Sequence, residues 1–195
     1  MTRIRLSCLA ILVCSSTLQS QDWANEWFST VFAGGKIKPD SMTALLRIEF
    51  GKALGANAPD FAFKNLDGDK LEKLADYKGQ VVVINFWATN CSGCRYEMPD
   101  LSRLQEAYRS KGLRVIFLSS QDKQLLLSYF KEHKVVGVNG TVDRNQLKRP
   151  YQMVAIPSSF VIDRNGIVRD TWVGPFAKFE ELEKRVLAFL ETNEK

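Results

Sequence analysis

The run VVVINFWA at residues 81–88 constrains the fold of this chain more than any other stretch. It is almost continuously apolar and rich in β-branched residues, which is the pattern of a strand buried on both faces. Residues 113–120, LRVIFLSS, repeat this pattern. We therefore expect two strands inside a sheet whose two faces are both covered.

Amphipathic helices are expected after both strands and near the end of the chain. Apolar residues recur at three- and four-residue spacing over residues 98–108, and the pattern closes at Gly112. Residues 122–133 begin with an acidic residue and show a similar pattern. A last amphipathic helix is predicted for residues 179–190.

Two further runs, residues 158–163 and 167–174, predict a β-hairpin. Asn165-Gly166 lies between them and supplies the positive φ angles that a tight turn needs. A short strand near residues 138–142 and a helical turn interrupted at Pro150 precede the hairpin. This order of elements predicts the α/β class, with a central mixed sheet flanked by helices on both faces.

The first 21 residues, MTRIRLSCLAILVCSSTLQSQ, have the pattern of an export signal. A basic start is followed by an apolar stretch at residues 6–13 and then by small polar residues, so we expect cleavage near Ser20. A retained anchor is the alternative, although the stretch is shorter than the ~20 residues that span a bilayer. The expected division is residues 1–20 as the signal, 21–54 as an extension without an assigned role, and 55–195 as the main domain.

Export makes the cysteine count informative. The chain has four cysteines, and Cys8 and Cys14 lie inside the expected signal. The mature chain would keep only Cys91 and Cys94, and a single close pair in an exported protein indicates a working redox couple. The net charge of +5 is too mild to indicate nucleic-acid binding.

The expected position of Cys91 favours reactivity. A strand ends near Ala88 and a helix begins near Cys91, so unpaired backbone N–H groups and the helix dipole would stabilise a thiolate there. Arg95 adds a positive charge nearby. Cys94 lies one turn further along, where it can attack a mixed disulfide formed by Cys91 and release the product.

Other uses of the C-x-x-C spacing are less consistent with the sequence. A zinc site needs two more ligands, and the chain has one histidine, His133, and no second cysteine pair. Covalent haem attachment requires histidine directly after the second cysteine, where Arg95 stands. We therefore expect no metal and no organic cofactor.

The motif NFWATNCSGCRYEMP, followed later by AIPSSFVIDRNG, resembles the thioredoxin superfamily and, within it, the exported TlpA/ResA-like thiol–disulfide oxidoreductases. The resemblance covers about residues 56–193 and implies a thioredoxin-like fold. It also implies a cis peptide bond before Pro157, a bond type essentially confined to proline. Trp87, Asn90, Ile156 and Pro157 would then line the substrate-facing surface. Asn90 departs from the family, which mostly has tryptophan at this place.

The resemblance also assigns the proton chemistry. Asn85 occupies the place of a buried aspartate in cytosolic thioredoxins, and an amide cannot ionise. C-x-x-C-x-x-E is a feature of the ResA-like branch, so Glu97 is the expected acid or base beside Cys94. A solvated glutamate on the helix surface is the alternative. The dipeptide Ser92-Gly93 carries no positive charge, which favours a reducing couple over an oxidising one.

These features together predict an extracytoplasmic enzyme, periplasmic or secreted, that reduces protein disulfides. Its partners would be protein thiols and disulfides, with apocytochrome c and a membrane thiol-electron donor implied by the resemblance alone. Two alternatives stay open. One is a thiol peroxidase on a related fold, although FWATNCSGC lacks the proline that frames a peroxidatic cysteine. The other is a non-catalytic binding domain in which the cysteines form a structural disulfide.

Overall fold

The apolar run at residues 81–88 supplies a central strand of a mixed sheet, and this strand ends at Phe86. The computed structural model of the chain describes residues 53–143 and 155–191, which lie within a single compact unit. These residues form a seven-stranded sheet in the order β2-β1-β5-β4-β3-β6-β7. β3 pairs in parallel with β4 on one side and antiparallel with β6 on the other, so the expected mixed sheet is confirmed.

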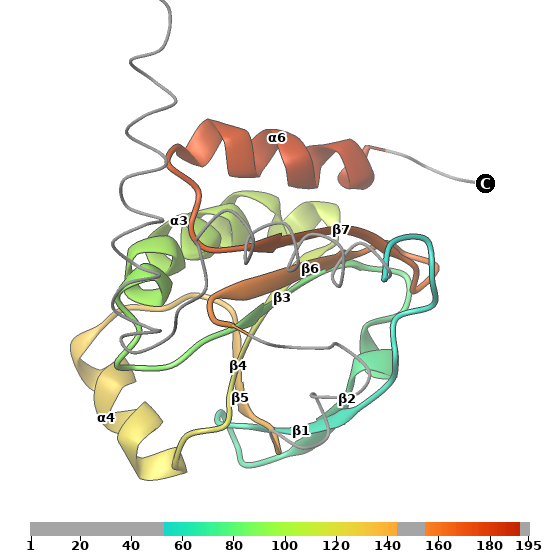
Figure 1. Cartoon of the computed structure of the whole chain (residues 1–195). Helices are drawn as coiled ribbons and strands as arrows, with labels where there is room; N and C mark the ends of the chain where they lie inside the picture. The colour runs from blue at the N-terminus through green and yellow to red at the C-terminus, as the bar shows by residue number, and fades with distance from the viewer. Residues whose placement is uncertain (1–52, 144–154, 192–195) are drawn as a thin grey trace, which may run out of the picture. The chain divides into compact units, whose positions relative to one another are not determined.

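Figure 1 shows the described elements along the chain. The strands are β1 (Ala62–Asn65), β2 (Leu71–Lys73), β3 (Val81–Phe86), β4 (Leu113–Ser119), β5 (Val138–Thr141), β6 (Ser158–Ile162) and β7 (Val168–Val173). The α-helices are α3 (Ser92–Tyr108), α4 (Lys123–Glu132) and α6 (Phe179–Leu190). Two 3-10 helices, η1 (Leu74–Tyr77) and η2 (Arg109–Lys111), complete the set.

One face of the sheet carries the core that supports the cysteine pair. Alternate residues of β3 and β4 point into this core, because side chains alternate between the two faces of a strand. The same core receives Leu101 from α3, Leu126 from α4 and Leu182 from α6, each fully buried. All three described α-helices therefore pack on this face of the sheet (Figure 1), whereas helices on both faces were expected.

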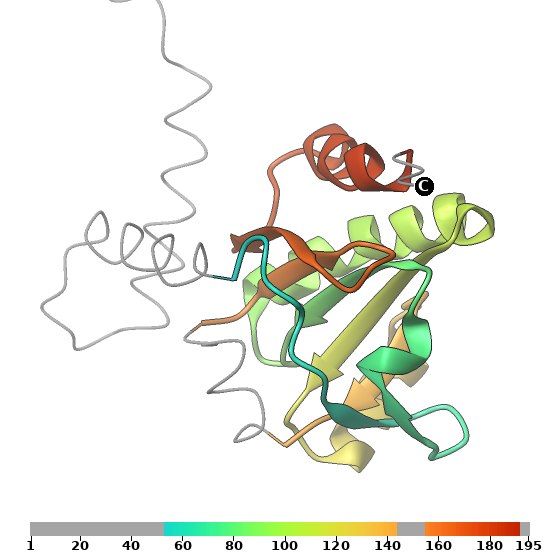
Figure 2. The same cartoon turned by 90° about the vertical axis from the view of Figure 1, so that its right-hand side faces the viewer.

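α3 and α6 lie side by side in both views (Figures 1 and 2). The Tyr108 hydroxyl of α3 donates a hydrogen bond to Glu183 Oε1 of α6 over 2.8 Å. Further along, the guanidinium carbon of Arg103 lies 3.8 Å from the centre of the Phe179 ring. The last helix of the chain is thus held against the helix that begins at the cysteines.

The expected elements agree with the structure over most of the described chain. The two buried strands, the three amphipathic helices, the strand near residue 138 and the hairpin are all present, with Gly166 at a φ of 85° in the turn. The three-residue strand β2 was not predicted, because it is too short to show a periodic pattern. The export signal, nearly all of the 21–54 extension and the turn at Pro150 lie outside the described residues.

Candidate active site

The two cysteines lie where β3 leads into α3. Cys91 is the N-cap of α3, and its Sγ accepts a hydrogen bond from the backbone N–H of Cys94 over 3.1 Å. The pair forms a disulfide. Cys91 is partly exposed, whereas Cys94 is fully buried. On reduction, a Cys91 thiolate would therefore lie at the positive end of the helix and within reach of a partner molecule, as the sequence predicts.

The loop before Cys91 is fixed by a pair of side-chain contacts that the sequence did not indicate. Gln121, just after β4, accepts a hydrogen bond from the backbone N–H of Thr89 over 2.7 Å through its Oε1. Its Nε2 donates in turn to Thr89 Oγ1 over 3.1 Å. These two bonds tie the loop between β3 and α3 to the end of the neighbouring strand.

Glu97 lies in the interior, one helical turn after Cys94 on α3, and is only 2% exposed. Three donors converge on its Oε1: Trp172 Nε1 at 3.1 Å, Asn85 Nδ2 at 3.3 Å and Ser159 Oγ at 3.3 Å. Its other oxygen, Oε2, is buried and has no hydrogen-bond partner among the described residues. The alternative of a solvated surface glutamate is therefore wrong.

Burial decides the charge of this carboxyl group. It raises the pKa of Glu97 from 4.5 to about 8, because the ionised form cannot be solvated in the interior. The hydrogen bonds from Trp172 and Ser159 lower the pKa, and the negative charge of Asp100 adds to the increase. Glu97 is thus mainly protonated at neutral pH and can give or take a proton with little cost.

The donors around Glu97 come from neighbouring strands of the sheet. Asn85 of β3 is the register partner of Ser159 of β6, and Ser159 is the register partner of Trp172 of β7. Register partners share a face of a sheet, so the three side chains form a row across it. Asn85 and Glu97 are indicated by the sequence, whereas Ser159 and Trp172 are not, because strand pairing of this kind leaves no local pattern.

The residues expected to contact substrate occupy different environments. Ile156 is partly exposed, Asn90 is exposed beside Cys91, and the Ile156–Pro157 peptide bond is cis. Trp87 is only 3% exposed, and its ring packs against Tyr129 and Phe130 of α4 at centroid distances of 5.1 and 5.5 Å. In this structure the Trp87 side chain therefore packs the start of the loop between β3 and α3 against α4. The substrate-binding roles of all four residues stay predictions.

Within residues 53–143 and 155–191, no three histidine, cysteine, aspartate or glutamate side chains gather in a way that could hold a metal ion. His133 is exposed and stacks on the Tyr129 ring, with the ring centres 4.1 Å apart. In the same part of the chain, no helix has the length and apolar character needed to cross a membrane.

The site combines a partly exposed cysteine at the start of a helix with a buried second cysteine and a buried carboxyl group. Together with the mixed sheet, this combination defines a thioredoxin-like thiol–disulfide oxidoreductase. Comparison with known proteins agrees. The AhpC/TSA family profile matches residues 54–171, and the chain belongs to this thioredoxin-like family. Its activity is that of a thiol–disulfide oxidoreductase.

Named relatives and solved structures are consistent with this assignment. The chain is 33% identical to thioredoxin-like protein YneN of Bacillus subtilis (strain 168) over 140 residues, which cover 71% of this chain and 81% of that protein. It is 32% identical to thiol-disulfide oxidoreductase ResA of Geobacillus kaustophilus over 135 residues, 69% of this chain and 76% of ResA. A Chlorobium tepidum crystal structure described as thiol:disulfide interchange protein DsbE superposes with a TM-score of 0.66 at 32% identity, covering 70% and 97% of the two chains.

Proposed function

We propose that this enzyme reduces disulfides in other proteins outside the cytoplasm, with Cys91 as the nucleophile and Cys94 as the resolving cysteine. One observation carries the proposal: the Cys91 sulfur is partly exposed at the start of α3, while the Cys94 sulfur is buried and bonded to it. A visiting protein can therefore reach only the first sulfur.

Reduction of a substrate proceeds in two exchanges. The Cys91 thiolate attacks one sulfur of the substrate disulfide, so that a mixed disulfide forms and the first substrate sulfur leaves and takes a proton. Cys94 then loses its proton and attacks Cys91 Sγ, which breaks the mixed disulfide and releases the second substrate thiol. The substrate gains two electrons and two protons, and the enzyme returns to the Cys91–Cys94 disulfide that the structure holds.

Glu97 serves both directions of the cycle. It is one helical turn after Cys94, and its raised pKa of about 8 lies near that of a thiol. As a carboxylate it accepts the Cys94 proton when the enzyme delivers electrons. As a neutral acid it returns a proton to Cys94 when a dithiol donor attacks Cys91 and reduces the Cys91–Cys94 disulfide.

The surroundings of the couple support reduction over oxidation. Ser92 and Gly93, between the cysteines, add no positive charge that would further stabilise the thiolate. A less stabilised thiolate makes the dithiol form a better reductant. The substrate-facing surface is proposed to be formed by the exposed Asn90, the partly exposed Ile156 and the buried Trp87 and Pro157.

The partners and the location follow from the resemblance and from the N-terminal pattern. The relatives named ResA and DsbE support protein thiols and disulfides as the substrate class. We propose apocytochrome c as one such substrate and a membrane thiol-electron carrier as the donor. The signal-like residues 1–20, cleaved or retained as an anchor, support a periplasmic or secreted location.

The decisive measurement is the reduction potential of the Cys91–Cys94 couple in the full chain, together with reduction of insulin. A potential near ~−270 mV and rapid insulin reduction are expected. A potential near ~−120 mV would reverse the proposed direction. Turnover of hydrogen peroxide without insulin reduction would instead indicate a thiol peroxidase, and a disulfide that resists dithiothreitol would indicate a non-catalytic domain.

A further inference from the structure

The two oxygens of Glu97 are in unequal surroundings. All three donors contact Oε1, and no described residue bonds Oε2. An oxygen that accepts three hydrogen bonds keeps its lone pairs occupied and is a poor place for a proton. The proton of the neutral acid therefore belongs on Oε2.

Among the three donors, Trp172 is the one with no alternative. A hydroxyl can turn and accept instead of donating, and the Asn85 amide also donates to Ser159 Oγ over 2.9 Å. The indole N–H can only donate, and it makes the shortest of the three contacts at 3.1 Å. With its side chain 7% exposed, Trp172 lacks a comparable partner in solvent.

The indole ring is itself fixed from its outer side. Phe176 meets it edge-on with the ring centres 5.1 Å apart. The guanidinium carbon of Arg185, from α6, lies 5.6 Å from the centre of the Trp172 ring and 5.3 Å from that of Phe176. These distances are within the range of cation–π contacts.

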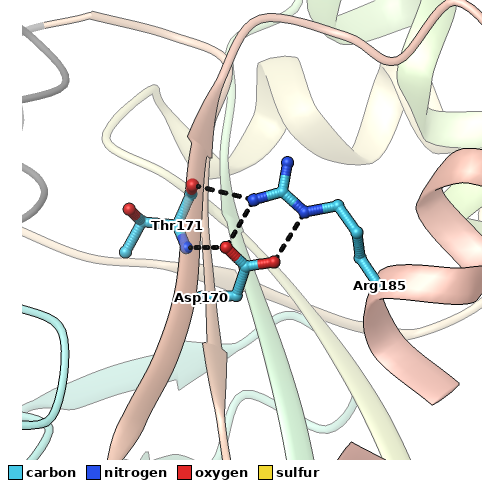
Figure 3. A network of polar contacts seen from close by, with 3 residues as sticks. All are labelled: Asp170, Thr171 and Arg185. Atoms are coloured by element: carbon cyan, nitrogen blue, oxygen red, sulfur yellow. Dashed lines mark hydrogen bonds and ion pairs between the residues drawn. The ribbon is translucent and has the colours of Figure 1, made fainter. Parts of the chain in front are cut away.

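Arg185 is held in place by β7. Its guanidinium makes a two-point contact with Asp170, including Nε to Oδ2 at 2.6 Å, and donates to the backbone carbonyl of Thr171 over 3.4 Å. Figure 3 shows that this network reaches from α6 to the strand that carries Trp172. A bidentate pair fixes orientation as well as distance, so Arg185 covers the ring in one arrangement.

We propose that Trp172 is a positioning residue for proton transfer at the cysteine pair: its indole N–H fixes Oε1 of Glu97 and leaves Oε2 to exchange the proton with Cys94. This inference rests on the proposed role of Glu97. Asp100 of α3 is the charged group that acts on Glu97, and uncharged Asn85, Ser159 and Trp172 donate to it from β3, β6 and β7. The charge of Arg185 behind the ring is balanced by Asp170.

The test is Trp172→Phe, which keeps an aromatic ring and removes the N–H. Because the hydrogen bond favours the carboxylate, its loss should raise the pKa of Glu97 by about one pH unit or more. Infrared titration of the carboxyl group reports this pKa directly. Stopped-flow oxidation of the reduced enzyme by a small disulfide should show the alkaline part of its pH–rate profile displaced by the same amount.

Two comparisons separate positioning from packing. Phe176→Leu disturbs the same aromatic contact but keeps the N–H, so its titration should match that of the wild type. In a Glu97→Gln background, Trp172→Phe should leave the pH–rate profile unchanged. An unshifted Glu97 titration in Trp172→Phe, or an equal displacement of the profile in the Glu97→Gln background, would overturn the proposal.

A second variant covers the case in which Trp172→Phe fails to fold. Benzothienylalanine at position 172 retains the shape of the two-ring system and replaces the N–H by sulfur, and it should give the same rise in the pKa of Glu97. The infrared readout does not depend on catalysis. If the wild-type enzyme reduced no disulfide but the titration still shifted, the proposed function would fail and the positioning by Trp172 would stand.

Discussion

Asn85 donates its side-chain amide to Oε1 of Glu97 over 3.3 Å, so an uncharged side chain and an ionisable one meet in the interior. Asn85 is 1% exposed, and its own Oδ1 has no hydrogen-bond partner within the described ranges. The Glu97 carboxyl group therefore contacts no second acid among the described residues, so it titrates without another carboxyl group in direct contact.

Asn85→Asp should place a second carboxyl group in contact with Glu97. Two adjacent buried carboxyl groups cannot both ionise at low cost, so the folded pair keeps a proton to higher pH than the unfolded chain does. Its folded pKa values are raised, and stability present at low pH should be lost as the pH rises. We expect near-wild-type unfolding free energy at pH 4 and a loss on the order of 2 kcal/mol at pH 8. Asn85→Ala, which adds no acid, should lose stability equally at both pH values.

Glu97→Gln should change the pH dependence of stability in the opposite sense. The folded pKa of Glu97 is about 8, above the ordinary glutamate pKa of 4.5, so ionisation favours the unfolded chain. The wild-type disulfide form should lose a few kcal/mol of unfolding free energy between pH 4.5 and 8, and Glu97→Gln should lose much less. Urea unfolding of both proteins across this range is the measurement. Parallel curves would contradict a buried, neutral Glu97.

Cys94→Ala should trap the first exchange. Cys91 can still attack a substrate disulfide, but no second sulfur remains to release the product. A stable mixed disulfide through Cys91 should accumulate, and turnover should fall by about a hundredfold or more. Mass spectrometry without reductant identifies the adduct. Cys91→Ala is the matched control and should form no adduct, because Cys94 is fully buried. Adducts at Cys94 would contradict the assigned order of attack.

Gln121→Ala should loosen the loop before the cysteines. The change removes the acceptor of the Thr89 N–H and leaves that partly buried group without its partner, at a cost of about 1 to 2 kcal/mol. Hydrogen exchange of the Thr89 amide should accelerate correspondingly. Gln121→Glu keeps an oxygen acceptor at the same distance and should retain most of the protection. Unchanged exchange in Gln121→Ala would show that the loop is held by other contacts.

Local sequence patterns account for most of the fold. The apolar run at 81–88 and the spacing that follows it are sufficient to place a buried strand and a helix that starts at Cys91. The three-residue spacing from Cys94 likewise puts Glu97 on the same side of that helix as Cys94, although the sequence left open whether its side chain is buried. These features depend on neighbours within one or two turns, where periodicity carries information.

The contacts around Glu97 and Thr89 depend on residues distant in the chain. Trp172 lies 75 residues from Glu97 and reaches it because β7 pairs with β6 and β6 with β3. Neither this pairing nor the position of Gln121 opposite Thr89 can be derived from the spacing of apolar residues. The same holds for Trp87, because its packing against α4 depends on how the chain folds back after β4.

The Arg185 contact links the last helix of the chain to the acid near the cysteines. Arg185 of α6 covers the outer side of the indole whose N–H bonds Glu97. A chain truncated before α6 should therefore keep both cysteines at the start of α3 and still hold Glu97 less firmly.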